Sequence, residues 1–412
     1  MLHSVINRSQ NDADYTARYL EYWLSSHFQP VYSVALRRPI GYEGLIRAKS
    51  QTGASIAPVE LLSMPRNSQQ KLALDQLCRT LHVQNFASQS VNNEWLFVNL
   101  NAQTLISEHP QTGFTHQLLE TSGLSPHRLV IEILENEIHD AERLKRYIDY
   151  FHQLGCLVAI DDFGTGHSNF DRIWRLEPDI VKLDRNLIRA AAQSQRAASV
   201  LSGMISLLHQ TGSLVVVEGV ETEQEATTAI AANADMIQGY YLGRPGPSLL
   251  TESTACDKID RLLLRQTDLR TQRSQGQAEK IRHFKTLFQR TLTDFISHQN
   301  LSNSSAHIFS DPRAVRCFLL DESGHQTHST LNAFHPRPQV ELRFAPLLCG
   351  DKGNWSHRPY HYLAIEQPGV TIVSEPYLSV AESRMCITLS QAIKVGNNVK
   401  VYCCDLDWQQ AS

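Results

Sequence analysis

Residues 1–250 contain short apolar runs that alternate with longer segments of helical periodicity. This alternation is typical of parallel strands joined by helices. Eight runs have the length and composition of strands, which favours an α/β fold of the (β/α)8 TIM-like barrel type, with an open parallel sheet as the alternative. The eight runs are HFQPVYSV, IGYEGLIRA, WLFVNLN, RLVIEIL, CLVAIDD, DIVKLD, LVVVEGV and MIQGYYLG.

The segment AERLKRYIDYFHQLG, residues 141–155, illustrates the helices predicted between these runs. Leu144, Ile148 and Phe151 fall on one helical face, and Gly155 follows as a typical C-cap residue. The spacing therefore predicts an amphipathic helix that ends at this glycine.

The pattern changes after Pro247, and residues 251–303 are predicted to form a helical linker. Two clusters of apolar residues at helical spacing lie on either side of the polar stretch TDLRTQRSQGQAEK. Gly276 within that stretch is a weak point, so we expect two helices or one kinked helix. The basic residues of the linker are interpreted as a solvated helical face, with a membrane or nucleic-acid contact as the alternative.

Residues 304–412 contain runs of alternating polarity that predict an antiparallel sheet in a smaller α+β domain. The runs are AVRCFLLDESGHQT, QVELRFAP, HYLAIEQPGVTIVSE, RMCITLSQAI and NVKVYCCDLDW.

Composition excludes several classes of protein. Among the 412 residues, 42% are apolar, as in an ordinary globular protein, and a formal net charge of −4 argues against a partner that is a nucleic acid polymer. The eight cysteines form no C-x-x-C pair, so a zinc site is not expected. The N-terminus lacks the pattern of a signal peptide, and no run of about 18 apolar residues occurs, so we expect a cytoplasmic protein without a transmembrane segment.

Polar residues interrupt or end seven of the eight predicted strands. In a barrel the carboxyl ends of the strands meet on one face, so these side chains are expected to converge in one pocket. Any one of them alone is equally well explained as a strand end that meets solvent. The residues are Glu43, Asn99, Glu132, Asp161 with Asp162, Lys182, Glu218 and Gln238.

Five carboxylates and an amide that converge with a single lysine require cations. Oxygen ligands select Mg²⁺ or Mn²⁺ over zinc or copper. Two ions would explain the adjacent pair Asp161–Asp162, because one carboxylate bridges both ions while its neighbour holds the second. Paired ions of this kind activate a water and neutralise charge on a phosphodiester. Lys182 would stabilise the developing charge, with a salt bridge between strands as the alternative.

The chain from about Tyr19 to Pro247 resembles the EAL-domain family of bacterial cyclic di-GMP phosphodiesterases. The signature tripeptide stands as Glu43-Gly44-Leu45 in GYEGLIRA, with glycine in place of the usual alanine. That change adds no bulk and removes no ligand. The other matching segments are FQPVYS, FVNLNAQ, LVIEILENE, AIDDFGTGHSNF, PDIVKLDRNLI, VVVEGVETEQE and IQGYYLGRP.

The resemblance implies roles for individual residues. Asp161 and Asp162 would hold the second of two divalent cations, with Glu218 bound to it directly or through water. Lys182 would contact the nucleophilic water, and Glu218 is the family's other candidate for a general base. The first cation would be held by Glu43, Asn99, Glu132 and Asp161, and substrate would be contacted by Gln29, Arg47 and Gln238.

The segment FGTGHSN after the aspartate pair resembles the family's mobile loop, which couples metal binding to dimerisation. Glu135 matches the glutamate that anchors this loop, and Gly164 and Gly166 permit the backbone turns it needs. An ordinary strand-to-helix turn is the structural alternative. The resemblance thus implies a homodimer, formed through barrel pairing or helix pairing.

The last 109 residues, 304–412, are similar to PAS-like or Cache-like sensory domains. An aromatic wall with an arginine and an aspartate suits a zwitterion such as an amino acid. A dimerisation module whose aromatic residues form its core is the alternative. The residues expected at the ligand are Trp355, Arg358, Tyr360, Tyr377 and Asp405.

These observations lead to two hypotheses of different classes. In the first, the protein is an enzyme that hydrolyses cyclic di-GMP to linear pGpG under control of the C-terminal domain. In the second, it is a receptor or scaffold that binds the nucleotide without turnover. The complete ligand set favours the enzyme.

Overall fold

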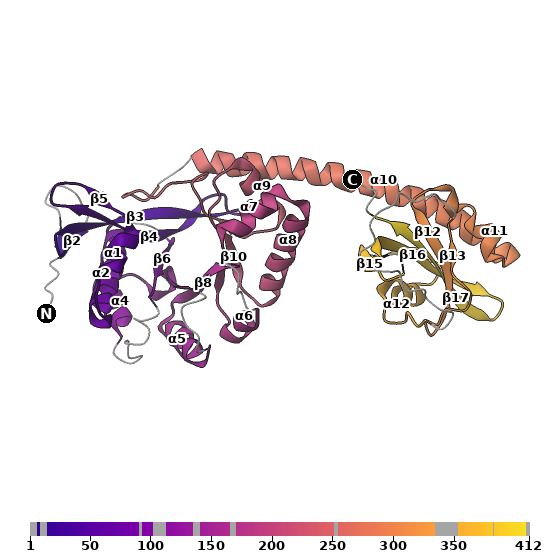
Figure 1. Cartoon of the computed structure of the whole chain (residues 1–412), viewed down its shortest axis with the longest axis horizontal. Helices are drawn as coiled ribbons and strands as arrows, with labels where there is room; N and C mark the ends of the chain where they lie inside the picture. The colour runs from indigo at the N-terminus through magenta and orange to yellow at the C-terminus, as the bar shows by residue number, and fades with distance from the viewer. Residues whose placement is uncertain are drawn as a thin grey trace. The chain divides into compact units, whose positions relative to one another are not determined.

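The computed structural model describes residues 6–8, 15–89, 93–101, 113–134, 141–164, 170–250, 254–333, 353–381 and 383–408. The chain divides into two compact units, Met1–Leu269 and Arg270–Ser412 (Figure 1). The chain passes from one unit to the other within a single helix, α10.

The first unit is built around a closed barrel of eight strands, as the sequence predicts. Seven strands follow one another in parallel, and β3 closes the ring by pairing antiparallel with both β4 and β11. The barrel strands are β3 (Tyr22–Ser33), β4 (Pro39–Ser50), β6 (Trp95–Asn99), β7 (Leu129–Leu134), β8 (Leu157–Phe163), β9 (Ile180–Leu183), β10 (Leu214–Val217) and β11 (Met236–Ile237).

The barrel interior is filled by a layer of apolar side chains to which seven strands contribute one residue each. Strands buried on both faces need apolar residues at successive positions, which explains the continuous Val, Ile and Leu runs in the sequence. The layer consists of Val31, Phe97, Val130, Ala159, Ile180, Val216 and Met236.

Helices surround the barrel and bury its outer face in a second, larger core. The predicted helix α5 ends one residue before Gly155, whose φ of 84° is the left-handed conformation expected of a C-cap glycine. The helices are α1 (Pro58–Ser63), α2 (Ser68–Ser88), α4 (Phe114–Ser122), the 3₁₀ helix η1 (Pro126–Arg128), α5 (Ala141–Leu154), α6 (Phe170–Leu176), α7 (Arg185–Gln193), α8 (Gln195–Gln210) and α9 (Glu223–Ala231).

Three short strands add to the barrel sheet beside β3 and β4. β1 and β2 continue the antiparallel pairing beyond β3, and β5 pairs with β4. Their bounds are Ile6–Arg8, Tyr15–Tyr19 and Ser55–Ile56.

The predicted linker contains one helix, α10, which spans Thr254–His298 and continues through Gly276. Its first turns bury Ala255, Ile259 and Leu262 in the core of the first unit. Its last turns bury four apolar side chains in the core of the second unit, namely Phe284, Phe288, Leu292 and Phe295. The helix is therefore held at each end by a different core.

The second unit contains an antiparallel sheet with strand order β13-β12-β17-β16-β14, and β15 pairs with β16. The long strands β12, β16 and β17 are those predicted from sequence. The elements are α11 (Leu301–Ser305), the 3₁₀ helix η2 (Ile308–Ser310), β12 (Ala314–Asp321), β13 (Leu331–Asn332), α12 (Pro359–Glu366), β14 (Ile372–Val373), β15 (Tyr377–Ser379), β16 (Arg384–Val395) and β17 (Asn398–Asp407).

The prediction of a strand at HYLAIE is wrong, because residues Pro359–Glu366 form the helix α12. Pro359 occupies the first helical turn, where its missing N–H costs nothing, and Tyr360 and Ala364 pack on the sheet one turn apart. The predicted run QVELRFAP lies outside the described residues.

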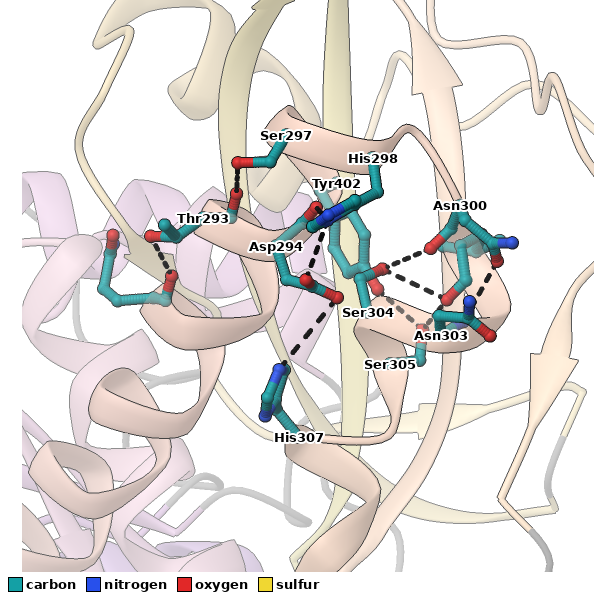
Figure 2. A network of polar contacts seen from close by, with 12 residues as sticks. Thr293, Asp294, Ser297, His298, Asn300, Asn303, Ser304, Ser305, His307 and Tyr402 are labelled. Atoms are coloured by element: carbon teal, nitrogen blue, oxygen red, sulfur yellow. Dashed lines mark hydrogen bonds and ion pairs between the residues drawn. The ribbon is translucent and has the colours of Figure 1, made fainter.

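Polar contacts fasten the end of α10 to the rest of the second unit (Figure 2). The carboxylate of Asp294 lies 3.0 Å from Nδ1 of His298 and 4.0 Å from Nε2 of His307. Ser305 on α11 and Tyr402 on β17 share a buried hydroxyl–hydroxyl hydrogen bond of 2.7 Å. The end of α10, α11 and the sheet thus form one packed body.

Candidate functional site

The polar residues predicted to converge do form one layer inside the barrel. Side chains two positions apart on a strand face the same side, so the residue that follows each apolar interior residue by two lies in the next layer. On β7, β8 and β9, Glu132, Asp161 and Lys182 stand two positions beyond the apolar residues of their strands. Asn99, Glu218 and Gln238 follow the apolar residues of their strands by the same two positions. On the antiparallel β3 the order is reversed, so Gln29 precedes Val31 by two positions.

Lys182 is the centre of this layer. Its side chain is 1% exposed. Its Nζ contacts one oxygen from each of four carboxylates. The distances are 2.5 Å to Glu132, 2.5 Å to Glu218, 3.2 Å to Asp161 and 3.7 Å to Glu43. One ammonium group therefore faces four carboxylates that come from four strands or strand ends.

This arrangement leaves an excess of negative charge. Burial lowers the pKa of Lys182, but the surrounding carboxylates, Asp161 first, outweigh it and hold the pKa well above its usual value. Burial also raises the pKa of Glu132 well above its usual range, although Lys182 opposes that rise. The pKa of Glu218 rises to about 8, again mainly through burial. Carboxyl groups in this state take up a proton or a cation readily.

A β-bulge brings two adjacent aspartates to the same site. The register between β8 and β9 shifts between Ile160 and Phe163, and Asp162 has a φ of 56°, in the left-handed region. In a regular strand these neighbours would point to opposite faces. Here Asp161, Asp162 and Glu218 each offer an oxygen within 4.8 Å of the others. Burial and the Asp161 charge raise the pKa of Asp162.

Two side-chain amides fix the carboxylate of Glu43. Asn99 donates from Nδ2 to one oxygen at 3.1 Å, and Gln238 donates from Nε2 to the other at 2.7 Å. Both hydrogen bonds span different strands, so they set the position of Glu43 relative to β6 and β11. Asn99 and Gln238 thus lie in direct contact with the acidic cluster.

The residues of this layer fit a pair of divalent cations. Glu43, Glu132 and Glu218 form one group of carboxylate oxygens within 4.8 Å, and the Asp161–Asp162–Glu218 group shares Glu218 with it. Oε1 of Glu132 and Oε1 of Glu218 are buried and each forms an ion pair with Lys182, and the buried Oε2 of Glu132 has no hydrogen-bond partner among the described residues. Buried oxygen acceptors with an excess of negative charge are what hard divalent ions require.

Among the described residues, neither Gln29 nor Arg47 makes a hydrogen bond or an ion pair with the acidic cluster. Gln29 stands opposite Glu43 in the register of β3 and β4, and its Nε2 lies 3.4 Å from the carbonyl oxygen of Gly243. Arg47 lines a cavity of about 490 Å³ together with Asn99. The guanidinium donates to the backbone carbonyl of Ile46 at 2.8 Å.

Sequence reasoning missed the polar residues that α2 contributes to this cavity. Asp75, Arg79 and His82 line it, and Arg79 and His82 are 2% and 4% exposed. The spacing of 75, 79 and 82 places them on one face of a helix. Polar residues at helical spacing among Leu74, Cys78 and other apolar positions were the available signal.

Two predicted features of the loop lie outside the described residues. These are Glu135 and the stretch 165–169, which includes Gly166. Gly164 is described, and its φ of 106° is the turn that the glycine was expected to permit.

In the second unit, four of the five predicted ligand residues form one cluster. Tyr360 stacks on Tyr377 with ring centroids 6.1 Å apart, and the guanidinium of Arg358 lies 5.3 Å from the Tyr377 ring. Asp405 is fully buried, 2.7 Å from Nε of Arg316, and accepts a hydrogen bond from Thr388. Trp355 packs against the same apolar core.

The comparison with protein families settles where the first unit belongs. The family model described as the EAL domain matches residues 17–245. The chain belongs to the EAL domain family. The matched residues contain the whole barrel and every polar side chain of the layer around Lys182.

Relatives extend the similarity beyond the EAL domain. The chain is 26% identical over 345 residues to an uncharacterized EAL-domain protein, YkuI of Bacillus subtilis, covering 81% of this chain and 82% of that one. The crystal structure of YkuI with substrate c-di-GMP and calcium superposes with a TM-score of 0.78 at 22% identity, over 93% of this chain and 96% of that one. Both units therefore share their fold with YkuI.

Several named phosphodiesterases match only part of this chain. The probable cyclic di-GMP phosphodiesterase PdeA of Escherichia coli is 32% identical over 151 residues, which are 36% of this chain and 21% of that protein. The chain spans less than a third of the length of several relatives, among them an uncharacterized signaling protein of Caulobacter vibrioides, which is matched over 27% of its length. Relatives of this EAL domain thus include cyclic di-GMP phosphodiesterases.

No described helix of the chain has the length and apolar content needed to cross a membrane.

Replacing Lys182 should destabilise the EAL domain when metal ions are removed. Lys182→Met leaves four carboxylates without their buried counter-charge, and we expect a loss of about 3 to 5 kcal/mol in the free energy of unfolding. Urea unfolding in EDTA measures it. The control is Lys145→Met, whose ion pairs with Asp149 and Glu177 lie at the surface, with an expected loss below about 1 kcal/mol. Equal losses in the free energy of unfolding of the two variants would contradict the role of Lys182 as the buried counter-charge of the carboxylates.

The raised pKa of Glu218 predicts a pH dependence of stability. The folded state favours the protonated carboxyl, so this stabilisation is complete below the ordinary pKa of 4.5 and is lost as the pH rises to about 8. Glu218→Gln imitates the protonated form at every pH. In EDTA, the Tm of this variant minus that of the natural protein should therefore increase from pH 5 to about 8 and then level off. The control is Glu177→Gln, at an exposed carboxylate, for which the difference in Tm should not depend on pH. A difference in Tm that is independent of pH for Glu218→Gln would refute the raised pKa of Glu218.

Proposed function

We propose that this protein is a metal-dependent phosphodiesterase that hydrolyses cyclic di-GMP to linear pGpG. The observation that carries the proposal is the complete layer of five carboxylates, one amide donor pair and one lysine at the carboxyl ends of the barrel strands. Crystal structures of relatives hold c-di-GMP with calcium or manganese, which supports the same nucleotide and a divalent cation here.

Glu43, Asn99, Glu132 and Asp161 would hold one cation, and Asp161, Asp162 and Glu218 would hold the second. Such ions supply a water that is ionised at neutral pH and neutralise charge on the phosphate. The five carboxylates suit Mg²⁺ or Mn²⁺ because hard cations prefer oxygen ligands.

The chain's own residues would then complete the reaction site. Lys182 reaches the carboxylates of both groups, so its ammonium is placed to donate to the attacking oxygen or to the phosphate as charge develops. Arg47 has a donor fork suited to a phosphate oxygen, and Gln29 and Gln238 suit hydrogen bonds to the nucleotide. Water adds across one P–O bond, and the leaving ribose oxygen takes a proton.

A catalytically silent receptor is the second candidate. It is favoured by one observation: Lys182 contacts four carboxylates at once, a state that would compete with cation binding. The free energy of cation binding would have to exceed these ion pairs before turnover could begin. We place the enzyme first because none of the predicted cation ligands is absent from the chain.

We further propose that the protein works in the cytoplasm as a homodimer. No disulfide joins any two of the seven described cysteines, which suits a reducing compartment.

The enzyme hypothesis predicts different losses for two substitutions. With Mn²⁺ and cyclic di-GMP, Glu43→Ala should weaken cation binding and abolish hydrolysis, because Glu43 is tied to both amides and Lys182. Lys182→Ala should retain nucleotide binding but lose at least about 100-fold in kcat, as expected for removal of a charge-stabilising donor. Chromatography of the products and isothermal titration measure the two effects, with Glu177→Ala as a surface control.

Near-normal rates in either variant would refute the assigned roles. If the natural protein binds cyclic di-GMP but leaves it intact with every divalent ion tested, the receptor hypothesis replaces the enzyme.

We also propose that the second unit, as a PAS-like or Cache-like domain, binds a small zwitterion and regulates the EAL domain. Arg358 over Tyr377 and the nearby Trp355 remain suited to a ligand, and neither Nε1 of Trp355 nor Nε of Arg358 has a hydrogen-bond partner among the described residues. Asp405 takes a structural role in this proposal, because Arg316 and Thr388 already satisfy its carboxylate.

A thermal-shift screen of the twenty amino acids on the full chain tests this ligand class. We expect at least one to raise the Tm and to change the rate of hydrolysis, and Arg358→Ala to remove both effects. Arg290→Ala, at an exposed position of α10, is the control and should retain them. If no amino acid binds, the second unit is better explained as a dimerisation module.

A further inference from the structure

The glycine of the tripeptide Glu43-Gly44-Leu45 lies directly against a buried histidine of α2. A Cβ atom built on Gly44 would lie 2.8 Å from Cγ of His82 and 3.0 Å from its Cβ. Carbon atoms that are not bonded rest about 3.5 to 4.0 Å apart. An alanine at position 44 is therefore incompatible with His82 unless the strand or the ring moves.

The ring of His82 is not free to move. It is 4% exposed, and its Nδ1 shares a 2.8 Å hydrogen bond with Oγ of Ser26, which is 5% exposed. Ser26 lies on β3, whereas Gly44 lies on β4, and Phe28 of β3 is the partner of Gly44 in the strand register. His82 thus contacts both strands of the antiparallel pair from the helical layer.

The position of Gly44 links this contact to the site. Side chains alternate along β4, so the face of Gly44 that meets His82 is opposite the face on which Glu43 joins the acidic cluster. A displacement of the backbone away from α2 would carry Glu43 toward Lys182 and disturb its hydrogen bonds with Asn99 and Gln238. His82 also lines the 490 Å³ cavity beside Arg47 and Asn99.

We infer that His82 is a positioning residue for the cation site, and that Gly44 and His82 are a size-matched pair that sets the place of Glu43 and Arg47 on β4. The imidazole fills the space that a methyl group would occupy and holds β4 against Ser26. The inference rests on the proposed function for its kinetic readout, but its cation readout is independent of hydrolysis.

The test is a double-mutant cycle in the full chain with Gly44→Ala, His82→Ala and the double variant. Mn²⁺ affinity is measured by titration of the metal alone, and kcat and KM are measured with cyclic di-GMP. Gly44→Ala should weaken Mn²⁺ binding and lower kcat/KM by about 10-fold or more, since the strand must move. In the His82→Ala background, Gly44→Ala should lower Mn²⁺ affinity and kcat/KM by less than about 3-fold.

Gly203→Ala is the matched control, because a Cβ at this helical glycine meets nothing within 4 Å. We expect its Mn²⁺ affinity and kcat/KM to be unchanged. His82→Asn is a second control, because asparagine retains Cβ and Cγ, the two atoms nearest the added methyl group, and it should therefore not relieve Gly44→Ala.

Equal losses from Gly44→Ala in both backgrounds would overturn the size match. A loss of Tm without any change in Mn²⁺ affinity or kcat/KM would overturn the positioning role and leave a packing contact alone. If Gly44→Ala is insoluble while the double variant folds, that result is itself the expected coupling.

The outcome for the natural protein separates the two proposals. If the natural protein binds Mn²⁺ but does not hydrolyse cyclic di-GMP, the proposed function fails. The double-mutant cycle can then still be evaluated from the Mn²⁺ affinities of the variants. If it binds no Mn²⁺, no cation site exists to be positioned, and the inference falls.

Discussion

The buried charge of Lys182 is the constraint around which the barrel interior is organised. An ammonium group at this depth is tolerated only because carboxylates surround it, and the carboxylates are tolerated only because something positive lies among them. One charge does not balance four. In the absence of metal, the ammonium group of Lys182 is therefore the counter-ion of the site. The remaining negative charge would be neutralised by divalent ions.

Of the two layers in the barrel interior, the apolar layer contributes stability and the polar layer contains the candidate functional site. The apolar layer from Val31 to Met236 supplies packing, and the polar layer begins two residues further along each parallel strand. Because every barrel strand except β4 contributes to both layers, the apolar layer sets the height and direction from which the carboxylates of β7, β8 and β10 enter the site. The bulge at Asp161–Asp162 is the one irregularity of β8, and it adds a second carboxylate that a regular strand would have turned away.

Local patterns in the sequence were sufficient for much of this arrangement. The eight apolar runs predicted the strands, and the polar residues at their ends predicted the side chains that meet at Lys182, because both depend on periodicity and chain direction. The helix α12 was missed because HYLAIE contains a short run of consecutive apolar residues, which periodicity alone cannot assign to a strand or to a helix. The contact of His82 with Gly44 depends on how α2 packs across two strands, which periodicity alone does not specify. The weakness assigned to Gly276 was overestimated, since one glycine costs a long helix only about 1 kcal/mol.

The closure of the barrel has a consequence for how the chain reaches its native state. The ring is completed only when β3, near the start of the chain, pairs with β11, a strand of two residues that lies some two hundred positions later. Contacts so distant in sequence form slowly, because closing the long loop between them costs conformational entropy before the contacts can stabilise the chain. During synthesis, the carboxylates and Lys182 would remain on an open, curved sheet until Met236 and Ile237 leave the ribosome. The layer around Lys182 is therefore enclosed by a complete ring only after β11 has paired with β3.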